Sequence, residues 1–575
     1  MLPQRGRRGE SLPPSPAHLR VRSAENYAHL VAAHARQATS DSLYPGLNYE
    51  NLSQYLLQPY SQHYHPQSSA SLSTESASAA QATCFAMLYD LAAAENERAT
   101  PFISPEAFEN SATIQALGTS ETGHLLFLRG NPTPEWLNTI GYMCNIDPEF
   151  FLRHLDFRAT AGKPDYFNLP GLPSSKSNFL RLHWTTIGSR GATFERHGRD
   201  QEEVELLRND SARRMEHYLD ETRSGHKMKI CDSFVRRFAV HDGTHFSFEQ
   251  DVSICINSIG NSWIVVVWQD VGSDLTQGPS GPWLESPNRS YSWKTRALPT
   301  MQYKPNMALD ARIPVVRRPS EGPQPRKFAQ SASLLYLDYG KGLDEELAAY
   351  NPFYVLTDLF KFTAFSEIQF LNMMETKLMK ETDFSVINSR HSPTLSNLLY
   401  SKKILDQHVQ QIEETISSIE THGNARSTDG LTESEEVLTA VASKLLKDFE
   451  YLAVRAKTLS AYCDRGMNIV MSNNMLVESQ RAIEQAAGVA KLTKLAFFYI
   501  PLSFTTSFFG MNFTQFGTGV LSIWVWFAAS TPVFVVSVLL LSLDISKIRG
   551  TGTAFFRALS KRKSRREGSD SRILD

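Results

Sequence analysis

The first half of the chain shows the apolar spacing of β-strands. Short apolar runs at Phe85–Tyr89 and His124–Leu128 have the length of buried strands. The segments Val252–Ile256 and Trp263–Trp268 are rich in β-branched and aromatic residues, and a turn containing Asn and Gly separates them. This combination is typical of a β-hairpin. The pattern therefore predicts an α/β domain over residues 81–270.

The two segments that flank this domain have the composition of irregular chain. Residues 1–80 are rich in Ser, Pro, Gln and His. They offer too little apolar surface to offset the entropy of ordering, so we expect a disordered tail. Residues 271–330 are dense in proline, which favours a linker or an irregular insertion.

Helical spacing dominates after residue 330. Residues 331–431 are predicted as a helical region, with candidate helices at Thr357–Lys380 and Thr394–Thr421. The next predicted helix carries one apolar seam with spacings of three and four. Its members are Leu438, Val441, Leu445, Phe449, Leu452, Ala456, Leu459, Cys463, Met467, Val470, Asn474 and Val477.

This helix is expected to be unusually long. No proline interrupts the chain between Glu435 and Ile500, so one helix can run from Glu435 to Phe508, about 110 Å at ~1.5 Å per residue. We assign residues 432–494 to a stalk helix. Periodicity leaves two interpretations open: a coiled coil beside a membrane anchor, or a stalk that joins a soluble domain to a pore.

Two apolar stretches follow, each close to the roughly 20 residues that cross a membrane. We predict transmembrane spans at 495–511 and 520–543, an outer loop at 512–519 and a basic tail at 544–575. Basic residues flank the pair on the same side, which places both termini in the cytosol. The predicted fold class is thus an α/β cytosolic domain, a long stalk helix and a C-terminal two-helix transmembrane hairpin.

One face of the first stretch carries small, hydroxyl-bearing and aliphatic residues. The stripe consists of Leu492, Ala496, Ile500, Ser503 and Ser507, which share a helix face because their spacings are three and four. Polar residues in an apolar helix face protein or water, so the stripe is a candidate pore lining. Helix packing also favours such residues and is the alternative.

Composition removes several function classes. The 58 basic and 60 acidic residues nearly balance, so no nucleic-acid partner is expected. The five cysteines are widely spaced and form no CxxC pair, which argues against a disulfide framework or a zinc site. Motifs for phosphate binding, nucleophilic hydrolysis and metal-dependent proteolysis are missing from the sequence, so we do not expect an enzyme.

The sequence between the two stretches, Gly510-Met511-Asn512, decides the interpretation. Together with Phe498-Tyr499-Ile500-Pro501-Leu502-Ser503-Phe504 before it, the long helix and the second apolar stretch, it resembles the CorA-type magnesium channel family. The resemblance covers about Glu435 to Lys547. It implies a homopentamer in a lipid bilayer that conducts divalent cations, with Mg²⁺ as the transported ion and no cofactor.

The resemblance also assigns roles to residues. Gly510, Met511 and Asn512 correspond to the metal-recognition ring, Ser503 to a polar pore ring, and Ile500 and Leu492 to an apolar constriction. The outer loop lacks the acidic residues that many members carry, so zinc or another transition metal is an alternative ion. A non-transporting membrane-anchored scaffold or sensor is a third hypothesis. The long N-terminal region suggests a eukaryotic, fungal member, in the plasma membrane rather than the mitochondrial inner membrane.

Overall fold

The computed structural model describes most of the chain between residues 23 and 539. The described ranges are 23–61, 84–155, 178–303, 328–423, 433–509 and 514–539, without residues 41, 94–97, 120–122, 192–200, 226–227, 285–294, 338, 341, 383–393, 515–519 and 521. The chain divides into two compact units, Met1–Met467 and Asn468–Asp575. The boundary falls inside the region predicted as one stalk, and each unit is described separately below.

The strands all lie in the first unit. They are β1 (Ala86–Asp90), β2 (Ala99–Phe102), β3 (Gly123–Arg129), β4 (Phe179–Arg190), β5 (Arg237–Val240), β6 (His245–Ile259), β7 (Ser262–Gln269) and β8 (Thr295–Ala297). The helices before and between them are α1 (Ala24–Ala35), α2 (Glu50–Leu57), α4 (Pro105–Glu109), α5 (Ala112–Gln115), α6 (Pro134–Met143), α7 (Pro148–His154) and α9 (Gln201–Ser224). Three-residue or four-residue 3₁₀ turns cover Leu47–Tyr49, Gln58–Tyr60 and Ser331–Leu334.

The remaining described helices, apart from the one over 523–539, follow the sheet in sequence. They are α10 (Glu345–Tyr350), α11 (Pro352–Val355), α12 (Thr357–Glu381), α14 (Thr394–Gly423) and α15 (Glu433–Phe509). The candidate helices at 357–380 and 394–421 are therefore confirmed within two residues at each end. The long uninterrupted helix is also present, because α15 has 77 residues and includes Pro501.

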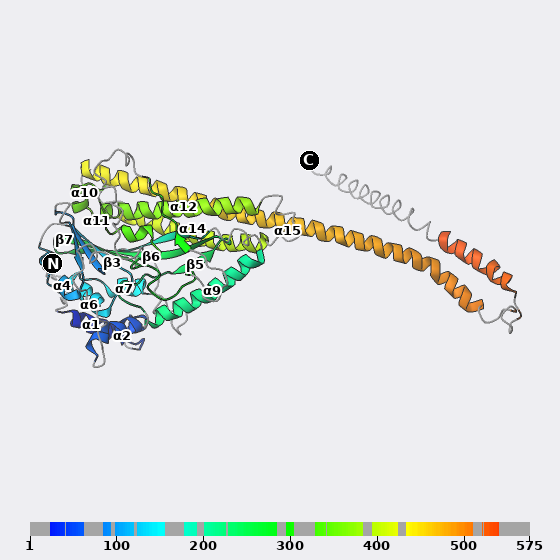
Figure 1. The fold of residues 1–575 in the computed structure, drawn as a ribbon, viewed down its shortest axis with the longest axis horizontal. Coiled ribbons are helices and arrows are strands. Elements are labelled where there is room, and N and C mark those ends of the chain that lie inside the picture. The colour runs from blue at the N-terminus through cyan, green and yellow to red at the C-terminus, as the bar shows by residue number, and fades with distance from the viewer. Residues whose placement is uncertain are drawn as a thin grey trace, which may run out of the picture. The chain divides into compact units, whose positions relative to one another are not determined.

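The strands form one mixed sheet that curls into a half-barrel. Its order is β2-β1-β3-β7-β6-β4-β8, with β5 paired to one end of β6. Only the β3–β7 pair is parallel among the described strands. The predicted hairpin is confirmed, since β6 and β7 pair antiparallel with Ile254 opposite Val267. In Figure 1, α1, α2 and α6 lie on one side of the sheet, and α12 and α14 lie on the other.

The structure differs from the predicted disordered tail at residues 24–57. Helices α1 and α2 pack against α6 through buried apolar side chains such as Tyr27 and Leu56. The Tyr27 hydroxyl donates to the Ile146 carbonyl at 2.9 Å, and Asn138 Nδ2 donates to the Leu56 carbonyl at 2.8 Å. Composition favoured disorder because the partners that bury these helices lie about a hundred residues away in the sequence.

Part of the proline-rich segment, predicted as a linker or an irregular insertion, also belongs to the core. Trp283 is fully buried, donates to the Leu275 carbonyl at 3.1 Å and meets the Tyr218 ring edge-on at 4.8 Å. Strand β8 pairs with the end of β4. The described residues of 271–303 therefore complete the sheet and cover it instead of linking two domains.

The apolar seam of α15 packs inside its own chain over most of its length. Leu445, Phe449 and Leu452 are buried, and the Phe449 ring meets Phe360 of α12 at 6.2 Å. Further along α15, Asp464 pairs with Lys402 of α14 at 2.9 Å. The seam needs no second chain to cover it from Leu438 to Cys463.

The predicted two-helix transmembrane hairpin, and with it the two-span localisation with both termini cytosolic, is wrong. Among the described residues, no helix combines the length and the apolar character that crossing a membrane requires. Lys494, Pro501 and several hydroxyl residues lower the mean hydropathy at the end of α15. The following helix is described only over 523–539, shorter than the roughly 20 residues of a span. The observed fold is a curled mixed sheet with helices on both faces.

Candidate functional site

The C-terminal part of α15 differs sharply from its N-terminal part. On the buried face, Leu452 and Cys463 are 2% and 0% exposed, whereas Met475 and Ile483 are 64% and 66% exposed. From Met471 to Ile500 nearly every residue is exposed. Contiguous exposed apolar surface marks a site of interaction rather than an ordinary protein surface.

All five residues of the predicted stripe are described, and all are exposed. Leu492 is 70% and Ile500 is 66% exposed, and Ala496, Ser503 and Ser507 fall in the same class. The structure therefore brings the five onto one accessible face of α15. The structure does not test whether these residues line a pore, and that role stays a prediction.

The opposite face of α15 is partly covered within the same unit, although Phe498 itself stays 45% exposed. The Phe498 ring meets Phe534 of the 523–539 helix edge-on at 4.7 Å. Thr505 is only 5% exposed, and at ~100° per residue it lies within about 20° of Phe498 around the helix. The same arithmetic places the centre of the stripe about 160° from Phe498. The stripe thus points away from the 523–539 helix.

The predicted metal-recognition residues lie outside the described residues. Gly510, Met511 and Asn512 follow directly after Phe509, the last residue of α15. In the part of the chain that the structure describes, no group of three or more His, Cys, Asp or Glu side chains is placed to hold a metal ion. The site is therefore built from the described stripe and from the sequence next to it.

A buried polar network on β6 was missed by the sequence analysis. Asp270, which follows β7, is fully buried and accepts two hydrogen bonds from Arg236, at 2.7 and 2.9 Å. His154 lies 3.2 Å from Asp270 and 2.9 Å from the Ser253 hydroxyl. Burial lowers the pKa of His154 more than the Asp270 carboxylate raises it. The ring is stacked on Trp268 at 4.0 Å and is 0% exposed, so this network holds the sheet together and does not reach a substrate.

A signal for this network does exist in the sequence. His245, Ser247, Glu249, Asp251 and Ser253 occupy every second position of β6. Such alternation predicts one polar strand face, and a polar face normally faces solvent. Here helices cover most of it, so each of these groups except the partly exposed His245 has a partner in the protein interior.

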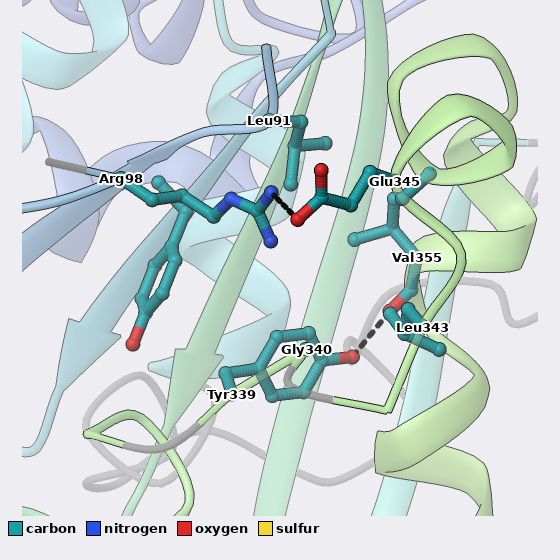
Figure 2. A pocket seen from close by; sticks show the side chains of 9 residues that line it. Leu91, Arg98, Tyr339, Gly340, Leu343, Glu345 and Val355 are labelled. Carbon is teal, nitrogen blue, oxygen red and sulfur yellow. Dashed lines mark hydrogen bonds and ion pairs between the residues drawn. The ribbon is translucent and has the colours of Figure 1, made fainter. Parts of the chain in front are cut away.

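A small pocket between β1 and α10 carries no functional group of its own (Figure 2). Its rim holds the ion pair between Arg98 and Glu345, at 2.9 Å. The Tyr339 hydroxyl donates to the Val355 carbonyl, and the Tyr89 hydroxyl donates to the Tyr336 carbonyl at 2.5 Å. With its polar groups committed to the protein, the pocket contributes to packing.

Neither the protein-family models nor the curated protein sequences match this chain. The function is therefore inferred from the residues and from their arrangement.

Cysteine cross-linking tests which face of α15 meets another copy. We expect Ser503→Cys to form covalent dimers under mild oxidation, because position 503 lies on the exposed stripe, and a copy packed there brings two thiols together. Thr505→Cys is the matched control, two residues away on the covered face. Dimers are read on a non-reducing gel. The five native cysteines are buried, so wild type should stay monomeric on the gel. Equal cross-linking at both positions would contradict the assignment of the face.

Proposed function

We propose that this protein is a homo-oligomeric transport protein for divalent cations, with Mg²⁺ as the preferred ion. The observation that carries the proposal is the exposed stripe of α15, which ends directly before Gly510-Met511-Asn512. The helix is anchored in the folded domain at one end and presents Leu492, Ile500 and Ser503 at the other. Copies of α15 packed around an axis would place these residues along a shared path.

The chemistry of the residues supports this assignment. Mg²⁺ loses its hydration water reluctantly, so it is recognised through its bound waters. Asn512 carboxamides from several copies provide neutral oxygens that accept hydrogen bonds from those waters without trapping the ion. Ser503 hydroxyls continue the polar contacts, and Ile500 and Leu492 form dry rings that can close by dewetting.

The number of copies follows from the same proposal. A single α15 stripe cannot enclose a path, so several chains are required, and we propose five. The acid-free segment from Asn512 to Gly519 weakens electrostatic capture of cations. Zinc or another transition metal is therefore the alternative ion on the same arrangement, and the experiment below separates the two.

Cation uptake in cells tests the function. Expression of the full chain in a host that lacks its own Mg²⁺ uptake should restore growth at low Mg²⁺ and raise cellular Mg²⁺. The Asn512→Ala variant should show reduced uptake at equal protein level, because the hydrated ion loses its first polar contact. Uptake of Zn²⁺ but not Mg²⁺ would select the alternative ion. No uptake of either ion, with the oligomer intact, would overturn the transport proposal and favour a scaffold or sensor.

A further inference from the structure

A buried histidine joins the sheet to two helices of the first unit. His408 of α14 is 1% exposed, and its Nδ1 lies 2.9 and 3.0 Å from the two carboxylate oxygens of Glu367 on α12. Its Nε2 lies 3.7 Å from Glu249 Oε1 on β6. We call Glu249, His408 and Glu367 the His408 cluster. Three separate elements meet in it.

The geometry identifies the proton that can be lost. An ionised carboxylate only accepts hydrogen bonds, so the short contact to Glu367 fixes a proton on Nδ1. A neutral imidazole then presents a lone pair at Nε2, facing the Glu249 carboxylate. A doubly protonated ring presents N–H groups to both carboxylates instead. The arrangement therefore favours the imidazolium, with Nε2 as the atom that titrates.

Other charged groups around the ring modify this preference. Arg237 on β5 pairs with Glu249 at 2.8 Å, and Gln407 and Gln411 of α14 donate to the same carboxylate. His241, in the turn before β6, faces the cluster across Phe370, whose ring stacks on His408 at 4.1 Å. Burial alone would lower the pKa of His408, but the Glu367 and Glu249 carboxylates raise it above its ordinary value.

We propose that the His408 cluster is a pH-sensitive contact that holds α14 against the sheet and weakens when Nε2 loses its proton. With a protonated ring, two carboxylates face two cations, His408 and Arg237. After deprotonation, the two buried carboxylates are left with one cation and with an unfavourable lone-pair contact at Nε2. Alkaline pH therefore weakens the attachment of α14 to β6.

The consequence extends to α15. Asp406, two residues before His408, accepts a hydrogen bond from Ser460 of α15, and Lys402 pairs with Asp464 of α15. Loosening α14 therefore loosens the N-terminal anchor of α15 in this unit. If the proposed transport function holds, the His408 cluster makes transport sensitive to pH. Only this effect on transport rests on the proposed function.

Hydrogen exchange of the purified full chain tests the pH dependence of the His408 cluster without a transport assay. We expect amides of α14 around residue 408 to exchange several-fold faster at about pH 8.5 than at about pH 6, after correction for the chemical rate. In His408→Asn, which keeps a donor near Glu367 but cannot titrate, the corrected rates should not depend on pH. Amides of α9 serve as the internal control.

A second measurement decides the matter if His408→Asn does not fold. Carbon-13 signals of histidine rings in the wild type report each titration directly. One ring should titrate above the ordinary value of about 6.5, and Glu249→Gln should move that titration to lower pH. Corrected exchange of α14 that is independent of pH in the wild type, or a His408 ring already neutral at about pH 6.5, would overturn the proposal. Either result leaves the cation-uptake experiment unaffected.

Discussion

Asp270→Ala is expected to lower the free energy of unfolding by about 3–5 kcal/mol, because it breaks a buried ion pair on one side only. The carboxylate is 0% exposed and accepts hydrogen bonds from Arg236 and from the Asp251 backbone N–H, at 2.6 Å for the latter. Removing it leaves the Arg236 guanidinium, 10% exposed, with weaker partners. Chemical denaturation monitored by tryptophan fluorescence measures the loss.

The same residue predicts a pH dependence with a definite sign. Burial alone would raise the pKa of Asp270, but Arg236 and His154 lower it below the ordinary value of about 3.9. A lowered pKa in the folded state gives stability that is present above about pH 3.9 and is lost as the pH falls through the folded value. The acid limb of the wild-type stability curve should therefore be flatter in Asp270→Ala.

A matched carboxylate on the surface controls for the loss of charge. Asp220 pairs with Arg223 at 3.1 Å on α9, and its side chain is 63% exposed. Exposed pairs one turn apart contribute little to stability, so Asp220→Ala should leave the unfolding midpoint almost unchanged. Equal effects of Asp220→Ala and Asp270→Ala would mean that the β6–β7 network does not hold the sheet.

Local patterns predicted the elements whose formation depends on neighbouring residues. The β6–β7 hairpin has β-branched strands around a turn, and the long helix needs only the absence of proline up to Ile500. Helices α1 and α2 were missed, since their burial depends on α6, which is far away in the sequence. Periodicity in α15 showed that an apolar face exists but not what covers it.

The same distinction between local pattern and distant contact applies to the candidate site. The shared face of Leu492 to Ser507 follows from helix geometry, and the structure places all five residues on an exposed face. That Phe498, on the opposite face, packs against Phe534 could not be predicted, because this contact forms only when the two helices fold together. The His408 cluster was equally invisible, since its members come from β6, α12 and α14 and become neighbours only after folding.

The two parts of α15 should respond in opposite ways to one substitution. Leu452→Asp places a carboxylate at a position that is 2% exposed among apolar neighbours, which should cost on the order of 4 kcal/mol or more. Ile500→Asp places the same group at a position that is 66% exposed in the single chain, so the folded domain should keep its melting temperature. In an assembly of copies, however, these carboxylates would face one another, and like charges at an interface oppose association.

Thermal unfolding and light scattering on both variants separate folding from association. Leu452→Asp should melt at a markedly lower temperature, because Leu452 is buried by the helices of its own chain. Ile500→Asp should melt like the wild type but lose the oligomer and, in cells, cation uptake. A stable Leu452→Asp chain that only fails to associate would place the seam between copies. An Ile500→Asp chain that keeps its oligomer in a buffer without divalent cations would remove the stripe from the contact, because a ring of like charges around an axis then has no cation to neutralise it.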